Sequence, residues 1–77
     1  MKERVKKIIA TQLDVPPETI RENGNLIDDY GADSLDVVEL SLALEDEFGL
    51  NISDEEVYGF QTVGDIIHYV NTHTSHS

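Results

Sequence analysis

YGADSLDVVEL, residues 30–40, decides the fold because it contains the expected start of the longest helix in the chain. Asp33 is a residue type that favours the N-cap position, and Asp36 follows at a variant of the capping-box spacing. Gly49 supplies the left-handed residue that commonly ends a helix. The pattern therefore predicts a helix over residues 34–48.

Apolar residues at helical spacing predict a further helix near each end of the chain. The first covers residues 3–13 and ends before two prolines, and the last opens at Thr62 and ends near Asn71. SDEEV at 53–57 repeats the capping-box spacing and predicts a short helix before Gly59. No strand pattern accompanies these segments. We therefore expect an all-α fold, a small four-helix bundle with three main helices and one short third helix.

A long loop separates the first two predicted helices. Residues 14–32 contain Pro, Asn and Gly residues that do not sustain a helix, and so long a loop is unusual unless its own side chains pack it or it has a function. No interdomain linker is evident, so we expect a single domain over residues 1–77, with a frayed polar tail over residues 72–77. The expected anchors of the loop are Val15, Ile20, Leu26 and Ile27.

The charge of the chain is large and uneven. Sixteen acidic residues against five basic ones give a formal net charge of -11. Four of the basic residues lie within the first seven positions, whereas residues 28–56 include eleven acids and no basic residue. Such a surface repels nucleic acid and anionic membranes and favours association with basic protein patches. The alternative is that the acids only keep a small protein soluble.

The sequence also bears on location and on covalent cross-links. It has no cysteine, so we expect neither disulfides nor cysteine-ligated zinc. The first residues lack the apolar core of a secretion signal, and no segment approaches the ~20 apolar residues of a membrane span. We therefore expect a cytoplasmic protein without a membrane span.

The helix predicted over residues 34–48 has two apolar stripes, given roughly 100° per residue. One stripe should face the core and comprises Val37, Leu40, Leu44 and Phe48. The other comprises Leu35, Val38 and Leu42, flanked by Glu39, Glu45 and Asp46. Two interpretations stay open for the second stripe: it is a docking ridge with an acidic rim, or the long loop covers it.

Three roles are possible for Ser34 at this helix start: capping the helix, acting as a nucleophile, or carrying a covalently attached group. A serine there is most often the cap, but Asp33 competes for that position. If Asp33 is the cap, the Ser34 hydroxyl stays free at the first helical position, in the half-positive field of the helix N-terminus. Asp33 and Asp36 oppose a bound phosphate, although a phosphate attached covalently to the serine need not be held by affinity.

Catalysis and metal binding by this chain are disfavoured. Ser34 lacks the G-x-S-x-G nucleophile elbow, and no histidine lies near it in sequence. His68 is expected on the polar flank of the last helix, while His73 and His76 give only a weak metal signal. We therefore predict no catalytic residue and no metal site.

GADSLDVVELSLALEDEFG, residues 31–49, closely resembles the core of bacterial acyl carrier proteins, and ERVKKIIATQL, residues 3–13, resembles their first helix. The similarity runs from about residue 2 to 71. It implies a freestanding carrier of type II fatty acid synthesis, in which Ser34 bears 4′-phosphopantetheine in phosphodiester linkage. A separate magnesium-dependent phosphopantetheinyl transferase installs this arm from coenzyme A. The terminal thiol then holds acyl chains as thioesters, so the resemblance implies a monomeric shuttle rather than an enzyme.

The resemblance also implies two groups of binding residues. The face met by basic patches of the transferase, acyl transferases and fatty acid synthase enzymes comprises Asp33, Leu35, Asp36, Val38, Glu39, Leu42, Glu45 and Asp46. The acyl chain folds back into the bundle, and the candidates that contact it are Leu26, Leu44, Ile52, Val57 and Phe60.

Some positions depart from the commonest bacterial pattern. Tyr30 stands where leucine is frequent, Ser41-Leu42 where valine-methionine is usual, and Gly59-Phe60 where lysine-isoleucine is usual. Tyr30 and Phe60 bear on partner preference and cavity depth but not on the attachment site. Two alternatives remain open: a carrier for a polyketide or D-alanyl pathway, and an acidic helical adaptor that is never modified.

Overall fold

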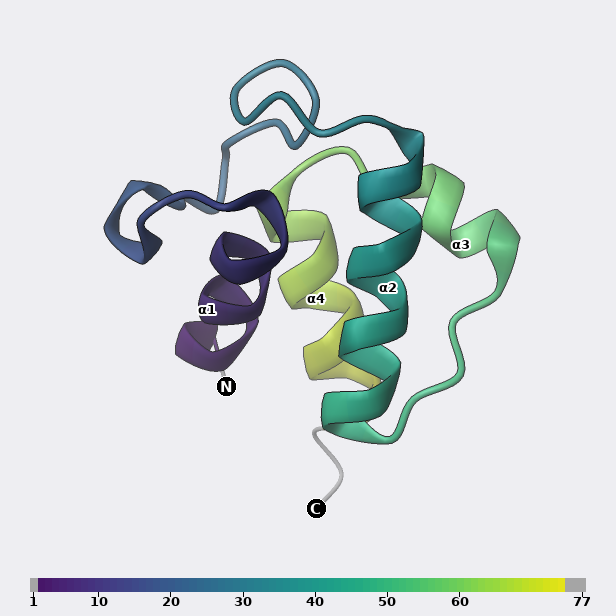
Figure 1. Ribbon diagram of the computed structural model, residues 1–77. Coiled ribbons are helices and arrows are strands. Elements are labelled where there is room, and N and C mark those ends of the chain that lie inside the picture. Colours follow the sequence, from purple (N-terminus) through teal and green to yellow (C-terminus); the bar gives the residue numbers. More distant parts are fainter. Residues whose placement is uncertain (1, 75–77) are drawn as a thin grey trace.

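The computed structural model describes residues 2–74, which form four α-helices and one short 3-10 turn (Figure 1). The helices are α1 (Lys2–Leu13), α2 (Ser34–Phe48), α3 (Asp54–Gly59) and α4 (Val63–Thr74), and the 3-10 turn, η1, is Pro17–Thr19. The all-α prediction is confirmed, as is the span predicted for the longest helix. In the described part of the chain, extended pairing is limited to one isolated antiparallel bridge between Asn25 and Thr62.

The core lies between the three long helices. α1 packs against both α2 and α4, and the short α3 lies beside α2 at one side of the bundle (Figure 1). The stripe of α2 predicted to face the core does so: Val37, Leu40 and Leu44 are buried, and Phe48 packs against them half-buried. Burial of such side chains stabilises each by about 1.5–3 kcal/mol, so the stripe orients α2 in the bundle.

The long loop crosses one end of the bundle and is tied to the start of α4. The Leu26 amide donates to the Gln61 carbonyl at 2.9 Å, and the Gly64 amide donates to the Glu22 carbonyl at 2.7 Å. Two of its predicted anchors, Ile20 and Leu26, are buried, and Val15 packs partly buried against the core. The loop therefore packs by its own side chains.

Ile27 is an exception, and its prediction as an anchor is wrong because the side chain is 55% exposed. The Asn25 carboxamide oxygen accepts from the amides of Ile27 and Asp28, both at 2.9 Å. This turn directs Leu26 into the core and Ile27 outward.

The last helix is longer than predicted. It continues past Asn71 to Thr74, so the expectation of fraying from residue 72 is wrong for residues 72–74. The Thr74 hydroxyl donates to the Val70 carbonyl at 2.7 Å, and the His73 ring stacks on Tyr69 with centroids 3.9 Å apart. These contacts add to the backbone ladder and extend the helix by a turn. The rest of the predicted tail, residues 75–77, lies outside the described residues.

Candidate functional site

Ser34 is the first residue of α2, at the end of the bundle that the long loop crosses. Asp33 occupies the cap: its Oδ1 accepts from the Asp36 amide at 2.9 Å, and Asp36 Oδ2 accepts from the Asp33 amide at 3.2 Å. Gly49, with φ 66°, ends the helix as predicted. The Ser34 side chain is exposed, and no hydrogen bond to its hydroxyl occurs within residues 2–74. This hydroxyl is therefore free to be modified.

A phosphodiester fits this position. Because the Asp33 and Asp36 carboxylates are both engaged in the capping box, attachment at the Ser34 hydroxyl would displace no intramolecular hydrogen bond. The exposed side chain leaves room for a bulky group, and the helix N-terminus supplies a partial positive charge close to the added anion. The arrangement tolerates a covalent phosphate without forming a pocket that holds one by affinity.

A small cavity of about 80 Å³ lies beside Ser34, between α2, α3 and the long loop. Two of the residues predicted to contact an acyl chain, Val57 and Phe60, line it. The other three, Leu26, Leu44 and Ile52, are buried in the core and do not line this cavity. Besides Ser34 itself, the remaining lining residues are Ile27, Val37 and Tyr58, which were not predicted for this role.

The sequence holds a partial signal for these missed residues. Val37 lies three positions after Ser34 and therefore on the same side of α2, which helical spacing alone indicates. Ile27 and Tyr58 reach the cavity only through the packing of the long loop and α3 against α2. Their position depends on tertiary structure, so local patterns do not reveal it.

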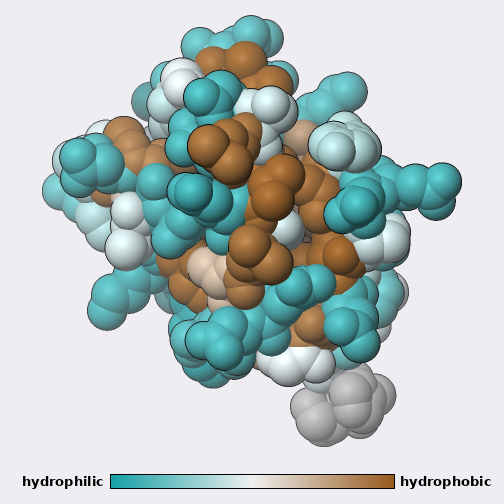
Figure 2. All heavy atoms as spheres, turned by 45° about the vertical axis from the view of Figure 1, so that its right-hand side comes forward, coloured by the Kyte–Doolittle hydropathy of each residue, from teal (hydrophilic) through white to brown (hydrophobic). Residues whose placement is uncertain are grey.

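The second apolar stripe of α2 is largely uncovered. Leu35 is 62% exposed and Leu42 is 58% exposed, so the interpretation that the loop covers them is wrong. Val38 is half-buried and packs against the core. Ile27 and Tyr58 are also exposed large apolar residues. Figure 2 shows apolar side chains gathered on the face that α2 and α3 turn outward, with hydrophilic groups around them. This face combines an apolar middle with an acidic surround.

The predicted acids of this face differ in accessibility. Asp33, Glu39 and Asp46 are exposed, whereas Asp36 and Glu45 are half-buried. Glu45 Oε2 accepts from the Ile52 amide at 2.7 Å, which joins α2 to the segment before α3. Glu45 thus has a structural bond in addition to any contact with a partner.

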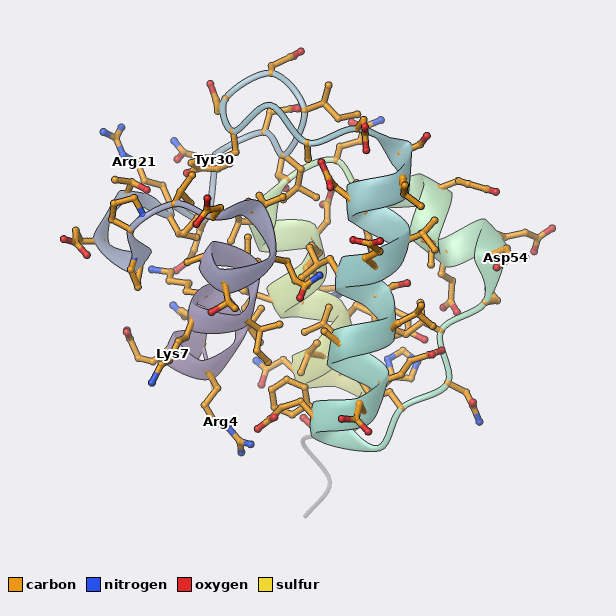
Figure 3. All side chains as sticks on the ribbon, viewed as in Figure 1. Arg4, Lys7, Arg21, Tyr30 and Asp54 are labelled. Atoms are coloured by element: carbon orange, nitrogen blue, oxygen red, sulfur yellow. The ribbon has the colours of Figure 1, made fainter. Side chains whose placement is uncertain are left out.

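The basic residues lie mainly on α1. Arg4 and Lys7 extend from α1, on the other side of the bundle from Asp54 of α3 (Figure 3). Arg4 pairs with Glu47, and Lys2 Nζ lies 2.8 Å from Glu22 Oε2. The hydrogen bond and charge of Glu22 raise the pKa of Lys2, and Lys2 in turn lowers the pKa of Glu22. Apart from Glu47, the exposed acids of α2 have no basic partner in the described structure.

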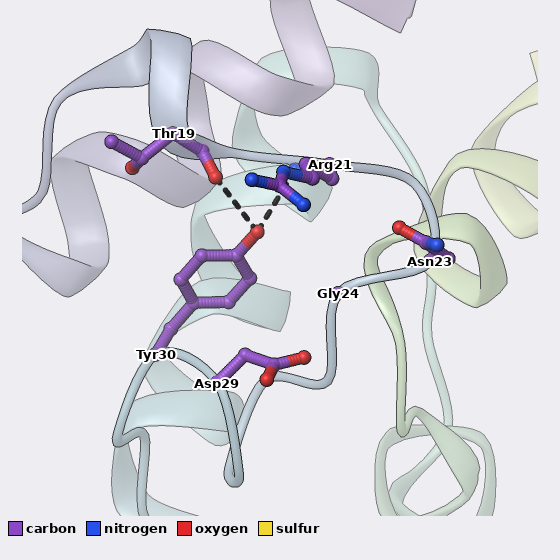
Figure 4. A pocket seen from close by; sticks show the side chains of 6 residues that line it. All are labelled: Thr19, Arg21, Asn23, Gly24, Asp29 and Tyr30. Atoms are coloured by element: carbon purple, nitrogen blue, oxygen red, sulfur yellow. Dashed lines mark hydrogen bonds between the residues drawn. The ribbon is translucent and has the colours of Figure 1, made fainter.

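A polar cavity of about 340 Å³ lies within the long loop (Figure 4). The Tyr30 hydroxyl donates to the Thr19 carbonyl and accepts from the Arg21 amide, both at 2.9 Å. A side chain at Gly24 would clash with the Tyr30 ring, because an added Cβ would lie 2.5 Å from the hydroxyl oxygen. Tyr30 therefore closes the loop on itself, which is a structural role for this departure from leucine.

The two histidines of the described chain lie on α4. His68 is exposed on α4, as predicted, and His73 stacks on Tyr69; His76 lies outside the described residues. Among residues 2–74, no group of three or more His, Cys, Asp or Glu side chains is arranged to hold a metal ion. No helix in this part of the chain is long and apolar enough to cross a membrane.

Comparisons with known proteins agree with this geometry. A family model described as the phosphopantetheine attachment site matches residues 3–70, so fold and site define a protein modified with phosphopantetheine. An acyl carrier protein of Clostridium perfringens is 49% identical over 74 residues, which cover 96% of this chain and 97% of the relative. One from Wolinella succinogenes is 47% identical over 68 residues, covering 88% and 90%.

The same family appears among solved structures. One from Mycobacterium tuberculosis, described as an acyl carrier protein, matches with a TM-score of 0.86 at 35% identity, covering 92% of this chain and 95% of that one. The chain therefore belongs to the family of acyl carrier proteins, whose prosthetic group is 4′-phosphopantetheine.

Proposed function

We propose that this chain carries acyl groups as thioesters on a 4′-phosphopantetheine arm attached to Ser34, and that it passes them between enzymes of type II fatty acid synthesis. The observation that carries the proposal is the exposed, unbonded hydroxyl of Ser34, set at the capped start of α2 inside the matched segment. The protein then acts as a non-catalytic carrier that other enzymes load and unload.

Attachment requires little of the carrier beyond presenting Ser34. The Ser34 oxygen forms the new bond to phosphorus, its proton passes to a base on the transferase, and the nucleotide half of coenzyme A leaves. The cap formed by Asp33 keeps the serine hydroxyl out of the capping hydrogen bonds. Once attached, the arm supplies the thiol that this cysteine-free chain lacks.

We propose that partners dock on the outward face of α2. Leu35 and Leu42 supply exposed apolar area next to Ser34, with Val38 partly accessible between them. Complementary charge speeds encounter and selects partners with basic patches. The acids proposed to serve this role are Asp33, Asp36, Glu39, Glu45 and Asp46. The Glu45 carboxylate also accepts the hydrogen bond from the Ile52 amide.

The acyl chain is proposed to enter the cavity beside Ser34. Val57 and Phe60 contact its first carbons, and Leu26, Leu44 and Ile52 form the core behind. We further propose a monomer that works in the cytoplasm, because a net charge of -11 opposes association of two copies and favours transient pairing with basic enzymes.

The test is the intact mass of the apo protein after incubation with coenzyme A, Mg²⁺ and a broad-specificity phosphopantetheinyl transferase. We expect a gain of one phosphopantetheine, absent in Ser34→Ala. An unmodified adaptor would gain nothing, and a gain that persists in Ser34→Ala would place the arm elsewhere. Either result would overturn the proposal.

A further inference from the structure

Phe60 stands between two cavities. On one side is the cavity of about 80 Å³ beside Ser34, and on the other is a larger space of about 390 Å³ between α3 and α4, which is a groove open to the surface. The linings of the two cavities share Phe60 and no other residue of the described chain. The other residues that line the larger space include Gly59, His68 and Tyr69, together with the acids Glu56 and Asp65. A single ring thus separates a narrow space at the attachment site from a wider one beyond it.

The Phe60 ring is held in place by α4. It is 9% exposed, and it meets the Tyr69 ring edge-on with centroids 5.6 Å apart at 74°. The Tyr69 hydroxyl oxygen lies 3.1 Å from Glu56 Oε1 and 3.2 Å from the Asn51 carbonyl oxygen. Burial and the Glu56 carboxylate raise the pKa of Tyr69, so the phenol stays protonated and donates at neutral pH. Through Tyr69, the Phe60 ring is therefore braced against the segment before α3 and the first turn of α3.

We infer that Phe60 determines the length of acyl chain that the carrier shelters, by closing the inner end of the cavity beside Ser34. This inference rests on the proposed function. A volume of about 80 Å³ accommodates a few methylene-sized groups, taking ~30 Å³ as the share of one water molecule. Longer chains project into solvent or displace the ring. Removing the ring joins the two cavities and extends the sheltered path toward Tyr69.

The experiment measures how chain length stabilises the loaded carrier. Apo protein is loaded from acetyl-, butyryl-, hexanoyl-, octanoyl- and decanoyl-coenzyme A, each product is confirmed by intact mass, and each Tm is compared with that of the unacylated holo form. Because each sheltered methylene removes apolar surface from water, Tm rises with chain length until the cavity is full. We expect the wild type to level off near butyryl and Phe60→Ala to keep rising to octanoyl or decanoyl.

Phe48→Ala is the matched control. Phe48 is a half-buried phenylalanine that packs against the core at the other end of α2, where the Arg4 guanidinium lies 5.1 Å from its ring centroid. This variant should lower every Tm and leave the levelling point unchanged. Phe60→Leu, which fills more of the space, gives a shorter extension and serves if Phe60→Ala loses its helical circular dichroism.

Two results would overturn the inference: a wild-type Tm that climbs steadily through decanoyl, or the same levelling point in Phe60→Ala, Phe60→Leu and wild type. Either result can be distinguished from failure of the proposed function, because the intact mass of the protein reports attachment at Ser34 independently of Tm.

Discussion

The starts of α2 and α3 use the same capping device with opposite consequences for a serine. At α3, Ser53 is the cap: its hydroxyl accepts from the Glu56 amide at 3.3 Å and donates to Glu56 Oε1 at 3.0 Å. At α2, Asp33 is the cap and Ser34 follows it. One serine hydroxyl is held by two hydrogen bonds, and the other is held by none among the described residues.

This difference shows that the cap residue, rather than the serine itself, decides whether a hydroxyl at a helix start is available. Both serines are exposed, and an acid follows each of them within two positions. An aspartate one position earlier takes the cap at α2, which leaves the Ser34 hydroxyl free for the attachment that we propose. The comparison predicts that exchanging or removing caps will separate loading from stability.

The largest effects are expected from the two serine-to-alanine variants. Ser34→Ala should abolish loading and leave the fold intact, because its hydroxyl makes no internal bond. Ser53→Ala should load normally but lose a cap worth about 1 kcal/mol, which lowers Tm by about 4–8 °C in a domain of this size. Intact mass and thermal circular dichroism check both. If Ser53→Ala keeps its helicity but is not loaded, the prediction that loading and stability can be separated is contradicted.

Removal of the α2 cap should affect both properties at once. In Asp33→Ala the Asp36 amide loses its acceptor, and Ser34 is the nearest residue able to replace it. We expect a loss of about 1 kcal/mol and slower loading, because the serine hydroxyl is drawn toward the helix. Asp33→Asn retains a good cap and is the control for charge. If Asp33→Asn loads as slowly as Asp33→Ala, the charge of Asp33 matters to the transferase rather than its cap.

Local rules predicted much of this region. The bounds of α2, the Asp33 cap and the left-handed Gly49 follow from residue spacing within one helix, and all three are confirmed. Such features depend on neighbours a few positions away, which the sequence displays directly.

Features that depend on distant segments were missed. Glu45 bonds to Ile52 seven positions away, and Ile27 and Tyr58 reach the cavity only through the packing of the long loop and α3 against α2. The division of space by Phe60 likewise needs α4 in place, because Tyr69 braces it. The sequence predicted the local features of the α2 start, but only part of what surrounds Ser34.

Charge reversal should produce smaller effects, on the loading rate when the acid lies on α2 and on Tm when it lies on α3. Glu39 is exposed on α2, whereas Glu55 lies in the first turn of α3, where acids stabilise the helix dipole. Glu39→Lys is expected to slow loading at low ionic strength and leave Tm nearly unchanged. Glu55→Lys should lower Tm by about 2–4 °C with loading preserved. The slowing in Glu39→Lys should fade as salt rises, since rim charges act mainly on encounter rates. Equal loading rates for both variants would argue that the acids of α2 only maintain solubility.

The smallest effect concerns acid pH and the α3 cap. The hydrogen bond from the Ser53 amide lowers the pKa of Glu56 below its ordinary value of 4.5, opposed by a lesser desolvation effect. A carboxylate whose pKa is lower in the folded state contributes stability that is fully present above the unfolded value and is lost as pH falls through the folded value. Wild type should therefore have the higher Tm at neutral pH when compared with Glu56→Gln, and the gap should close below about pH 4.5.

This comparison uses a difference in Tm because protonation of the many other acids affects both proteins alike. Glu55→Gln removes the same charge from the same turn but no capping bond, so it corrects for relief of repulsion. Thermal circular dichroism from pH 7 to 3 is the measurement. A gap between wild type and Glu56→Gln that stays constant over this range, after that correction, would mean that Glu56 caps α3 equally well in its neutral form. The capping box of Ser53 and Glu56 would then stabilise the start of α3 through its hydrogen-bond geometry rather than through the charge of Glu56.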